Sequence, residues 1–440
     1  MKRTALKKED NVMNFNMLHP ADQLVMMMER IYSYGMTTTS GGNLSIRDTN
    51  GDIWITPGSV DKGSLTRSDI VCVKPDGTVV GNHKPSSEFP VHKKIYETRP
   101  ELRAVLHAHP PALVAFSIVR VIPETKLIPK VAEICGSVAF ADYDVPGSIG
   151  LSEKIASKFA EGHNVVMLEN HGVFIGNEDI FAAFKAFETF DFCARLQIEA
   201  LKVGKLSALT PAQLSTYKEK QAAPLDEFVN KNITSEEKAS RRDMIKFVRR
   251  AYSQKLFTST QGTFSQRLSD GSIIITPYKM DREYLEPEDL VKISHGFCEQ
   301  GKTPSKSVQL HMKIYEQHPE INSIIIAHSP HIMAFAVSDA EFDSRTIPES
   351  YIMLRDVKKL PFGVTFRDHE LVSRTISHMT PIVLLENDGV LVTGASLLNA
   401  FDKLEVMEYS AKAILNTQAI GEVVKISDGE VKELREAFRF

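Results

Sequence analysis

Cysteine is scarce in this sequence, with four residues in a chain of 440, and long apolar runs are lacking. The cysteines form no CxxC pair and no zinc-ribbon spacing; they are Cys72, Cys135, Cys193 and Cys298. We therefore expect buried, reduced thiols and a cytoplasmic protein. No run of about 18 apolar residues occurs, which argues against a membrane-spanning segment. The N-terminal stretch MKRTALKKEDNVMNFN starts basic but has no apolar core, so we expect a lead-in to the first helix rather than a signal peptide.

A strong excess of charge of one sign is also lacking. The formal net charge is -4, which gives no reason to expect nucleic acid or an anionic membrane as the main partner. The composition is that of an ordinary globular protein, with 42% hydrophobic and 25% charged residues. Because 440 residues exceed what one hydrophobic core normally supports, the length predicts two domains of roughly 200 residues each.

The sequence repeats itself over a long period. The segment HKPSSEFPVHKKIYETRPELRAVLHAHPP begins at His83, and GKTPSKSVQLHMKIYEQHPEINSIIIAHSP begins at Gly301. Three further pairs of similar blocks keep the same order and nearly the same offset; they begin at Thr37 and Thr258, Leu65 and Leu285, and Val165 and Ile382. We infer a duplicated domain. The first copy spans residues 1–205 and the second spans 240–440, with a polar linker over 206–239.

Helix and strand patterns are mixed in both copies. Apolar residues recur at helical spacing over 21–34 and, in the second copy, over 240–253. Short β-branched or apolar runs predict strands at DIWIT and SIIIT and at VVML and IVLL. Long amphipathic helices are predicted at the end of each copy, over 178–202 and 396–415. Because turns such as TNGD favour hairpins, we expect an α/β fold with a mainly antiparallel central sheet covered by helices, present twice.

Three histidines and a glutamate form a candidate metal site in the first copy. His107 and His109 stand two residues apart in a strand-like run, so their side chains share one face. His171 lies in a tight turn after a predicted strand, and Glu88 immediately precedes a helical pattern. Three imidazoles and a carboxylate suit zinc or a similar divalent ion.

The second copy lacks most of this set although its apolar frame remains. Glu88, His107 and His171 correspond to Ser307, Ile326 and Asp388, and only His109 keeps a histidine, His328. Their joint loss indicates that the four residues act as one functional unit, and we expect no metal in the second copy. His92 is interpreted as a helix-packing residue, because its counterpart His311 survives without the others.

Five motifs of the first copy together resemble the class II aldolase/adducin family; they are GGN (41–43), ITPG (55–58), SSE (86–88), HAH (107–109) and NHG (170–172). The resemblance covers residues 20–202 and, more weakly, 240–416. It implies a three-layer domain whose central sheet lies between helices. It also implies that the second copy is a degenerate version of the same domain.

The resemblance assigns roles to individual residues. It implies that His107, His109 and His171 bind zinc, and that Glu88 is the fourth ligand and the catalytic acid/base. It also implies that a substrate phosphate is held by small and polar residues; they are Gly42, Asn43, Ser86 and Ser87, joined by Gly58 and Ser59 in an order reversed from the usual one. The expected reaction is carbon–carbon cleavage of a phosphorylated or acidic sugar through a metal-stabilised enediolate.

Several alternatives remain open at this level. Glu88 after two serines favours an aldolase or dehydratase over an epimerase, which resembles this pattern but carries aspartate there. Decarboxylase members and a non-catalytic scaffold, as in adducin, are further alternatives. By the same resemblance we expect a homo-oligomer, with a pseudo-four-fold ring built from two chains or a multiple. Tyr351 is considered as a side chain donated across such an interface.

Overall fold

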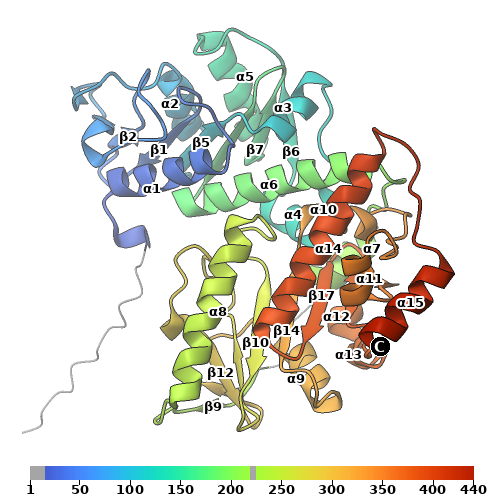
Figure 1. Cartoon of the computed structure of the whole chain (residues 1–440). Coiled ribbons are helices and arrows are strands. Elements are labelled where there is room, and N and C mark those ends of the chain that lie inside the picture. The colour runs from blue at the N-terminus through green and yellow to red at the C-terminus, as the bar shows by residue number, and fades with distance from the viewer. Residues whose placement is uncertain (1–14, 219–223) are drawn as a thin grey trace, which may run out of the picture.

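Two α/β units follow one another along the chain in this computed structural model (Figure 1). The structure describes residues 15–218 and 224–440, so the expected lead-in lies almost entirely outside the described residues. Within them, the first unit contains a sheet of eight strands and the second a sheet of nine. The predicted duplicated α/β fold is therefore confirmed.

The first sheet has the strand order β4-β3-β2-β1-β5-β8-β7-β6. Its neighbouring strands pair antiparallel, apart from the parallel pair β6 and β7, as expected from the hairpin-type turns. The strands are β1 (Asn43–Arg47), β2 (Ile53–Ile55), β3 (Val71–Val73), β4 (Val79–Val80), β5 (Ala104–Ala108), β6 (Val138–Ala141), β7 (Val165–Leu168) and β8 (Val173–Asn177).

Helices cover both faces of this sheet. One face packs against α1 (Pro20–Ser33), α3 (Pro111–Ile118), α4 (Pro129–Cys135) and α6 (Ile180–Ala200). The other packs against α2 (Phe89–Thr98) and α5 (Ile149–Ala160). Strand β5 shows the alternation, since Leu106 belongs to the first of these cores and Val105 to the second. Short 3-10 helices at η1 (Phe15–Met17), η2 (Arg67–Asp69) and η3 (Thr125–Leu127) complete the unit.

The second unit repeats this arrangement with the strand order β15-β16-β17-β14-β10-β11-β12-β13-β9. Its strands are β9 (Glu227–Phe228), β10 (Thr263–Arg267), β11 (Ile273–Ile275), β12 (Val291–Ser294), β13 (Phe297–Glu299), β14 (Ser323–Ala327), β15 (Lys358–Leu360), β16 (Ile382–Leu385) and β17 (Gly389–Gly394). Its helices are α8 (Ser235–Ser253), η4 (Pro287–Asp289), α9 (Val308–Gln317), α10 (Pro330–Ala336), α11 (Pro348–Leu354), α12 (Val364–Arg367), α13 (His369–Thr375), α14 (Leu397–Thr417) and α15 (Asp428–Phe438).

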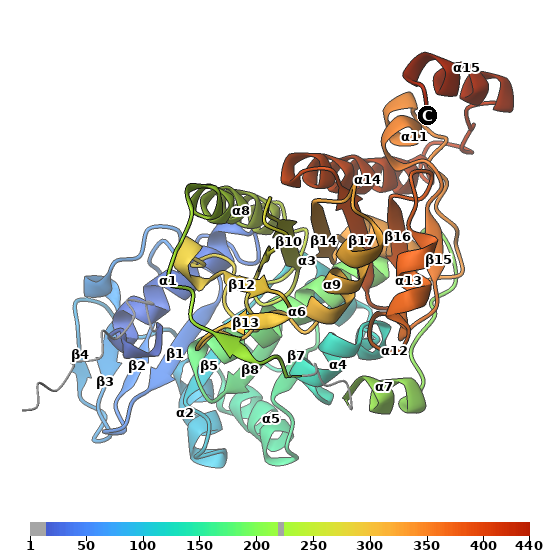
Figure 2. The same ribbon diagram turned by 90° about the horizontal axis from the view of Figure 1, so that it is seen from below.

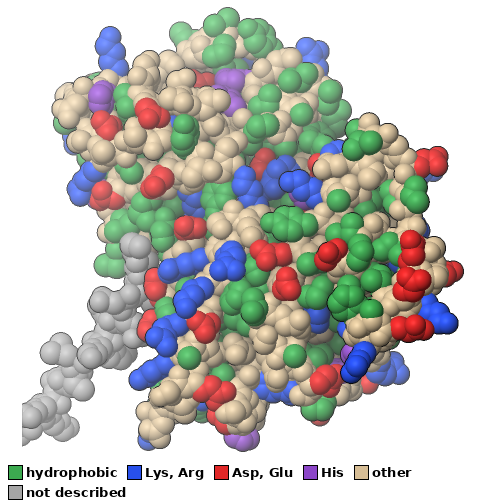
Figure 3. All heavy atoms as spheres, in the orientation of Figure 1, with side chains coloured by type: hydrophobic (Ala, Val, Ile, Leu, Met, Phe, Trp, Pro, Cys, Tyr) green, Lys and Arg blue, Asp and Glu red, His purple; other side chains and the backbone are tan. Residues whose placement is uncertain are grey.

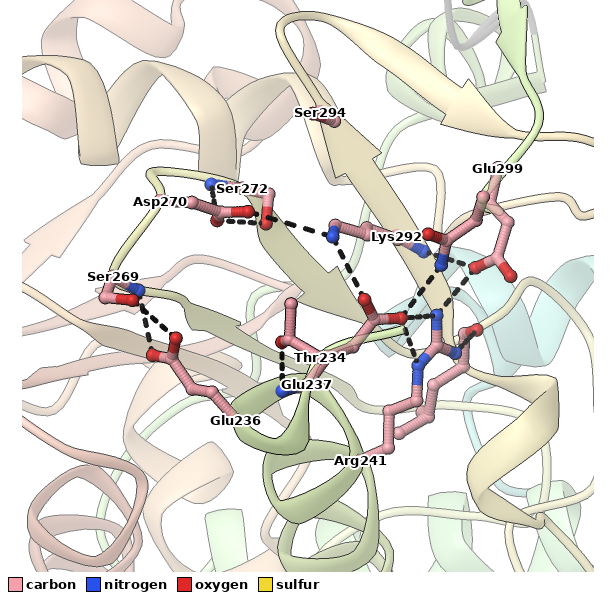
Figure 4. Close-up of polar contacts among 12 residues, drawn as sticks. Thr234, Glu236, Glu237, Arg241, Ser269, Asp270, Ser272, Lys292, Ser294 and Glu299 are labelled. Atoms are coloured by element: carbon pink, nitrogen blue, oxygen red, sulfur yellow. Dashed lines mark hydrogen bonds and ion pairs between the residues drawn. The ribbon is translucent and has the colours of Figure 1, made fainter. Parts of the chain in front are cut away.

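Part of the segment 206–239 contributes to the second unit. It contains the short helix α7 (Pro211–Lys218), and β9 pairs parallel with β13 at the sheet edge. Helix α8 begins at Ser235, earlier than the predicted 240, because the Thr234 hydroxyl accepts a hydrogen bond from the Glu237 amide at 3.1 Å. Buried Glu237 then accepts hydrogen bonds from Arg241 and from Lys292 of β12, as Figure 4 shows.

Helix α6 joins the two units through one continuous core. It crosses the middle of the molecule between the first unit and helices α8, α10 and α14 (Figure 1). Its buried residues and those of these three helices belong to the same apolar cluster. Although an amphipathic helix is predicted here, 16 of its 21 residues are buried, because the second unit covers the face that would otherwise meet water.

Helix α8 has a buried apolar face and an exposed basic face. In α8, Met244, Ile245 and Val248 are buried, whereas Lys246 and Arg249 are exposed, and Lys and Arg side chains accordingly gather along this helix in Figure 3. At the C-terminal end, α15 packs beside α11 away from the first unit (Figure 2). Among the described residues, none of the helices combines the length and the apolar character needed to cross a bilayer.

Candidate metal centre

Four side chains from three loops and one strand converge at the carboxyl end of β5, in the middle of the first sheet. His107 lies on β5 and His109 follows the end of that strand, with their Nε2 atoms 2.9 Å apart. His171 lies in the turn between β7 and β8, and Glu88 immediately precedes α2. Glu88 Oε2 lies 3.2 Å from His107 Nε2, and Glu88 Oε1 lies 4.0 Å from His171 Nε2. The structure thus brings together all four residues of the predicted site.

The backbone around these histidines requires small residues. Gly42 has a φ of +70°, and a Cβ there would lie 2.8 Å from the carbonyl oxygen of His107. A Cβ on Gly172 would lie 2.5 Å from the carbonyl oxygen of Ala108. These clashes explain the Gly in the GGN and NHG motifs, because only glycine allows the two turns to approach β5 so closely.

Glu88 is held in place by a chain of hydrogen bonds. Asn43 Nδ2 donates to Glu88 Oε2 at 2.6 Å, and Asn43 Oδ1 contacts Nε2 of His92. The other ring nitrogen of His92 lies 2.7 Å from Ser45 Oγ. Because the carboxylate only accepts, Asn43 Oδ1 is the acceptor toward His92, so His92 Nε2 carries the proton. His92, which was interpreted as a packing residue, therefore orients the carboxylate through Asn43.

Burial favours the neutral form of the three imidazoles, in which each ring has one nitrogen with a lone pair that can bind a cation. His107 is fully buried, and its Nδ1 donates to the carbonyl oxygen of Val173 at 3.0 Å, which leaves the Nε2 lone pair facing His109. Burial lowers the pKa of His107 well below its ordinary value, and burial together with its two histidine neighbours lowers the pKa of His109 to about 3. Burial also lowers the pKa of His171.

This geometry suits a cation. The ligand atoms of His107, His109 and His171 lie within 4.8 Å of one another. Oxygen Oε1 of Glu88 is buried and has no hydrogen-bond partner among the described residues. A buried acceptor without a partner, beside three neutral imidazoles, is costly without a cation to which they all bind. The cluster could therefore hold a metal ion.

The predicted phosphate-binding residues lie around this centre in two groups. Gly58 packs against Ser86 and Ser87, since a Cβ on Gly58 would lie 3.6 Å from the Cα of Ser86. Ser59 and Ser87 are exposed, and Ser59 has a φ of +56°, a conformation that favours glycine. Gly42 is buried beside β5. The Asn43 side chain differs from the expectation, because both of its polar atoms are engaged by Glu88 and His92.

In the second copy the same positions form no metal cluster within the described residues. His311 still contacts Ser265 Oγ at 2.7 Å, but its Nε2 has no partner there, because Thr263 stands where the first copy has Asn43. Tyr351, considered as an interface residue, is 2% exposed. Its hydroxyl accepts a hydrogen bond from Arg435 Nε at 2.8 Å, so it packs beneath α15.

Several known proteins are similar to one half of this chain. L-fuculose phosphate aldolase of Methanococcus maripaludis is 32% identical over 175 residues, which are 40% of this chain and 93% of that protein. Methylthioribulose-1-phosphate dehydratase of Acidiphilium cryptum is 31% identical over 189 residues, 41% of this chain and 90% of that protein. A solved L-fuculose 1-phosphate aldolase is 29% identical, with a TM-score of 0.42, and covers 46% of this chain and 95% of its own.

A sequence model of the family described as "Class II Aldolase and Adducin N-terminal domain" matches residues 22–198 and again residues 242–415. The two matches correspond to the two α/β units, and together they cover most of the chain. The chain therefore belongs to the class II aldolase and adducin family and contains its domain twice.

Proposed function

We propose that the first copy is the active site of a zinc-dependent lyase that cleaves a carbon–carbon bond in a phosphorylated or acidic sugar. One observation carries this proposal. The Glu88 carboxylate has one oxygen held by Asn43, while its other oxygen is buried without a partner among the described residues and lies beside neutral imidazoles. A carboxylate fixed at one oxygen and open at the other is suited to bind a cation and to transfer a proton.

Each residue has a role in this scheme. His107, His109 and His171 would hold the ion together with Glu88, and the ion when bound supplies a Lewis acid for the substrate's carbonyl and hydroxyl oxygens. Oε1 of Glu88 would accept the proton of the substrate hydroxyl that becomes the aldehyde when the carbon–carbon bond breaks. It would then return this proton to the other product. Ser59 and Ser87, which are exposed near this centre, would bind the anionic end of the sugar together with backbone amides of the glycine turns.

Metal analysis combined with a retro-aldol screen tests this function. Protein purified without chelator should contain roughly one divalent ion per chain, and it should release an aldehyde from at least one ketose phosphate or acidic sugar. Absence of bound metal, even after zinc is added, would contradict the proposal.

A dehydratase or epimerase is the second candidate, and similarity to a dehydratase favours the former. Product analysis separates the reactions, since an aldolase gives two fragments, a dehydratase gives a product lighter by one water, and an epimerase gives an inverted stereocentre of unchanged mass. A non-catalytic scaffold gives none of these products.

We also propose that two chains form a ring, because the first copy exposes a surface that is covered in the second. Ile118 is 57% exposed, whereas Val337 at the matching end of α10 is fully buried. Val337 is covered by the segment that follows α6, in which the Ser207 amide donates a hydrogen bond to the Val337 carbonyl oxygen at 2.8 Å. A second chain could cover Ile118 in the same way, since a head-to-tail contact that closes on itself makes a ring. Mass measurement in solution tests this, and a monomeric active protein would contradict it.

A further inference from the structure

The second copy has a cavity at the place that corresponds to the metal centre of the first. Its volume is about 320 Å³, at the small end of the range for metabolite sites. Residues of both copies line it, and those of the first copy include Lys130 and Glu133 of α4. Helix α4 lies beside α7 and α12 (Figure 2). Any ligand in this cavity would therefore contact both halves of the chain.

The metal-binding character of this position is gone. Ser307 stands where the first copy has the carboxylate of Glu88, so that carboxylate is absent. The two carboxylates that line the cavity are both engaged, Glu133 with Lys130 and Asp388 with Thr365. Ile326 replaces one imidazole, and Asp388 accepts a hydrogen bond from Thr365 at 2.5 Å. The cavity therefore lacks the donor set for a cation.

Hydroxyl groups take the place of these ligands. Thr263 Oγ1 lies 2.7 Å from Ser305 Oγ, which in turn lies 3.0 Å from Ser307 Oγ. Beside them, Gln261 is 7% exposed, and neither its Oε1 nor its Nε2 has a partner among the described residues. A buried amide without partners, in a cavity lined with hydroxyls, indicates that a polar ligand completes its hydrogen bonds.

Cations surround the cavity. Lys279 and Lys306 stand where the first copy has Ser59 and Ser87, with their Nζ atoms 5.2 and 5.1 Å from the ring centre of Tyr278. Neither forms an ion pair among the described residues. Lys130 of the first copy adds a third amino group at the rim, although it pairs with Glu133 at 2.8 Å.

The positive charges of Lys279 and Lys130 affect the pKa of a neighbouring lysine. The pKa of Lys185 on α6 is lowered, first by burial and then by the charges of Lys279 and Lys130. A buried guanidinium, Arg282, also lines the cavity and donates to the backbone carbonyls of Gln261, Gly262 and Pro277 rather than to a carboxylate. Positive charge at this junction of the two copies is therefore incompletely balanced by acidic groups.

We propose that this cavity binds the phosphate group of a small phosphorylated sugar without a metal ion, at a second site separate from the metal centre. Lys279 and Lys306 would contact the phosphate, and Gln261 and the three hydroxyls would bind the polar groups beside it. Because the ligand would contact residues of both copies, its binding would also stabilise their packing against each other.

Titration calorimetry at low salt with ribose 5-phosphate, on the full chain treated with a chelator, tests this site. The double variant Lys279→Ala/Lys306→Ala should weaken binding by about tenfold or more, since each lysine makes a charge-assisted contact. Both side chains are exposed, so folding should be unaffected, which circular dichroism checks. Ribose without phosphate should not bind.

Two control variants decide where the ligand lies. Ser59→Ala/Ser87→Ala changes the matching positions of the first copy and should leave this binding within about twofold. Lys246→Ala removes an exposed charge on α8 that does not line the cavity, and it should do the same. The proposal is overturned if binding is lost only in the serine variant, if all variants bind alike, or if Lys246→Ala weakens binding as much as the double variant does.

Discussion

At the scale of single residues, the two copies share a set of buried contacts beside the site and differ in the side chains around it. Ser45, His92 and Tyr96 in the first copy and Ser265, His311 and Tyr315 in the second make the same buried contacts. Only the first copy extends this chain through Asn43 to Glu88. Matched substitutions in the two copies therefore separate effects on the fold from effects on the chemistry.

Glu88→Gln should abolish most of the lyase activity while the protein stays folded. The amide keeps the shape of the side chain but cannot move the proton, so kcat should fall by about 10²–10⁴-fold. Steady-state kinetics and a thermal melt measure the two effects. The matched variant Ser307→Ala should retain the activity of the parent, and an active Glu88→Gln protein would refute the assigned role.

His92→Phe should weaken metal binding by about 10–100-fold, because Asn43 would lose the partner that keeps it aligned with Glu88. Competition with a chelator of known affinity measures this effect. His311→Phe is the control, since both rings are buried and only His92 connects to Asn43. Equal metal affinity in the two variants would contradict this role and would show that His92 serves only in packing.

At the scale of elements, the start of α8 depends on buried charge. Glu237 is fully buried and accepts hydrogen bonds from Arg241 at 2.7 Å and Lys292 at 3.0 Å (Figure 4). Burial alone would raise the pKa of Glu237, but the hydrogen bonds from Lys292 and Arg241 outweigh burial, and the pKa is lowered. These contacts tie the first turn of α8 to β12.

Glu237→Gln should lower the free energy of unfolding by about 3–5 kcal/mol at pH 7, because buried Lys292 loses its nearest carboxylate and buried Arg241 keeps only Glu299. Urea denaturation measures this difference. Glu236 is an exposed neighbour whose carboxylate accepts a hydrogen bond from the Ser269 amide at 2.8 Å. Glu236→Gln should lower the free energy of unfolding by about 1 kcal/mol or less. Similar losses in both variants would speak against a special role of the buried network.

The stability from Glu237 should depend on pH in one direction. Since its pKa is lower in the folded chain than in the unfolded one, the carboxylate contributes its full stability above the ordinary glutamate pKa of about 4.3. That contribution disappears as the pH falls through the folded value. Denaturation curves between pH 7 and pH 3 should therefore show the wild type and Glu237→Gln converging in acid, and a constant gap would contradict this assignment.

At the scale of the whole molecule, the two units are held by polar as well as apolar contacts. Arg30 of α1 donates to Asp281 at 2.6 and 2.8 Å and to the hydroxyl of Tyr252. Glu188 of α6 accepts from the Tyr252 hydroxyl at 2.7 Å and from the Ser259 amide at 2.6 Å. The second copy therefore supports the first through α6 even though it lacks the metal ligands.

A protein that ends at residue 205 should be less stable than the full chain and should lose activity. It would expose the face of α6 that packs against α8 and α10 and would leave Arg30 and Glu188 without their partners. Thermal melts and the lyase assay measure both losses. Full activity and an unchanged melting temperature would show that the second copy is dispensable.

The sequence alone determined the duplication and the α/β class, and it predicted the four residues that the structure brings together at the candidate metal centre. Repeats, strand alternation around His107 and His109, and glycine turns are local patterns, so they can be recognised without knowing the distant contacts. The sheet and its helices follow from the same short-range periodicities. The roles of the substrate-binding residues were predicted from resemblance alone and stay predictions.

Only the tertiary structure decided which distant side chains meet. It showed that Asn43 and His92 orient Glu88 and that α6 is buried on nearly all sides. It also placed Lys130 of the first copy at the cavity of the second. These contacts join residues far apart in the chain, and their partners are set by how whole layers pack, which no local pattern encodes.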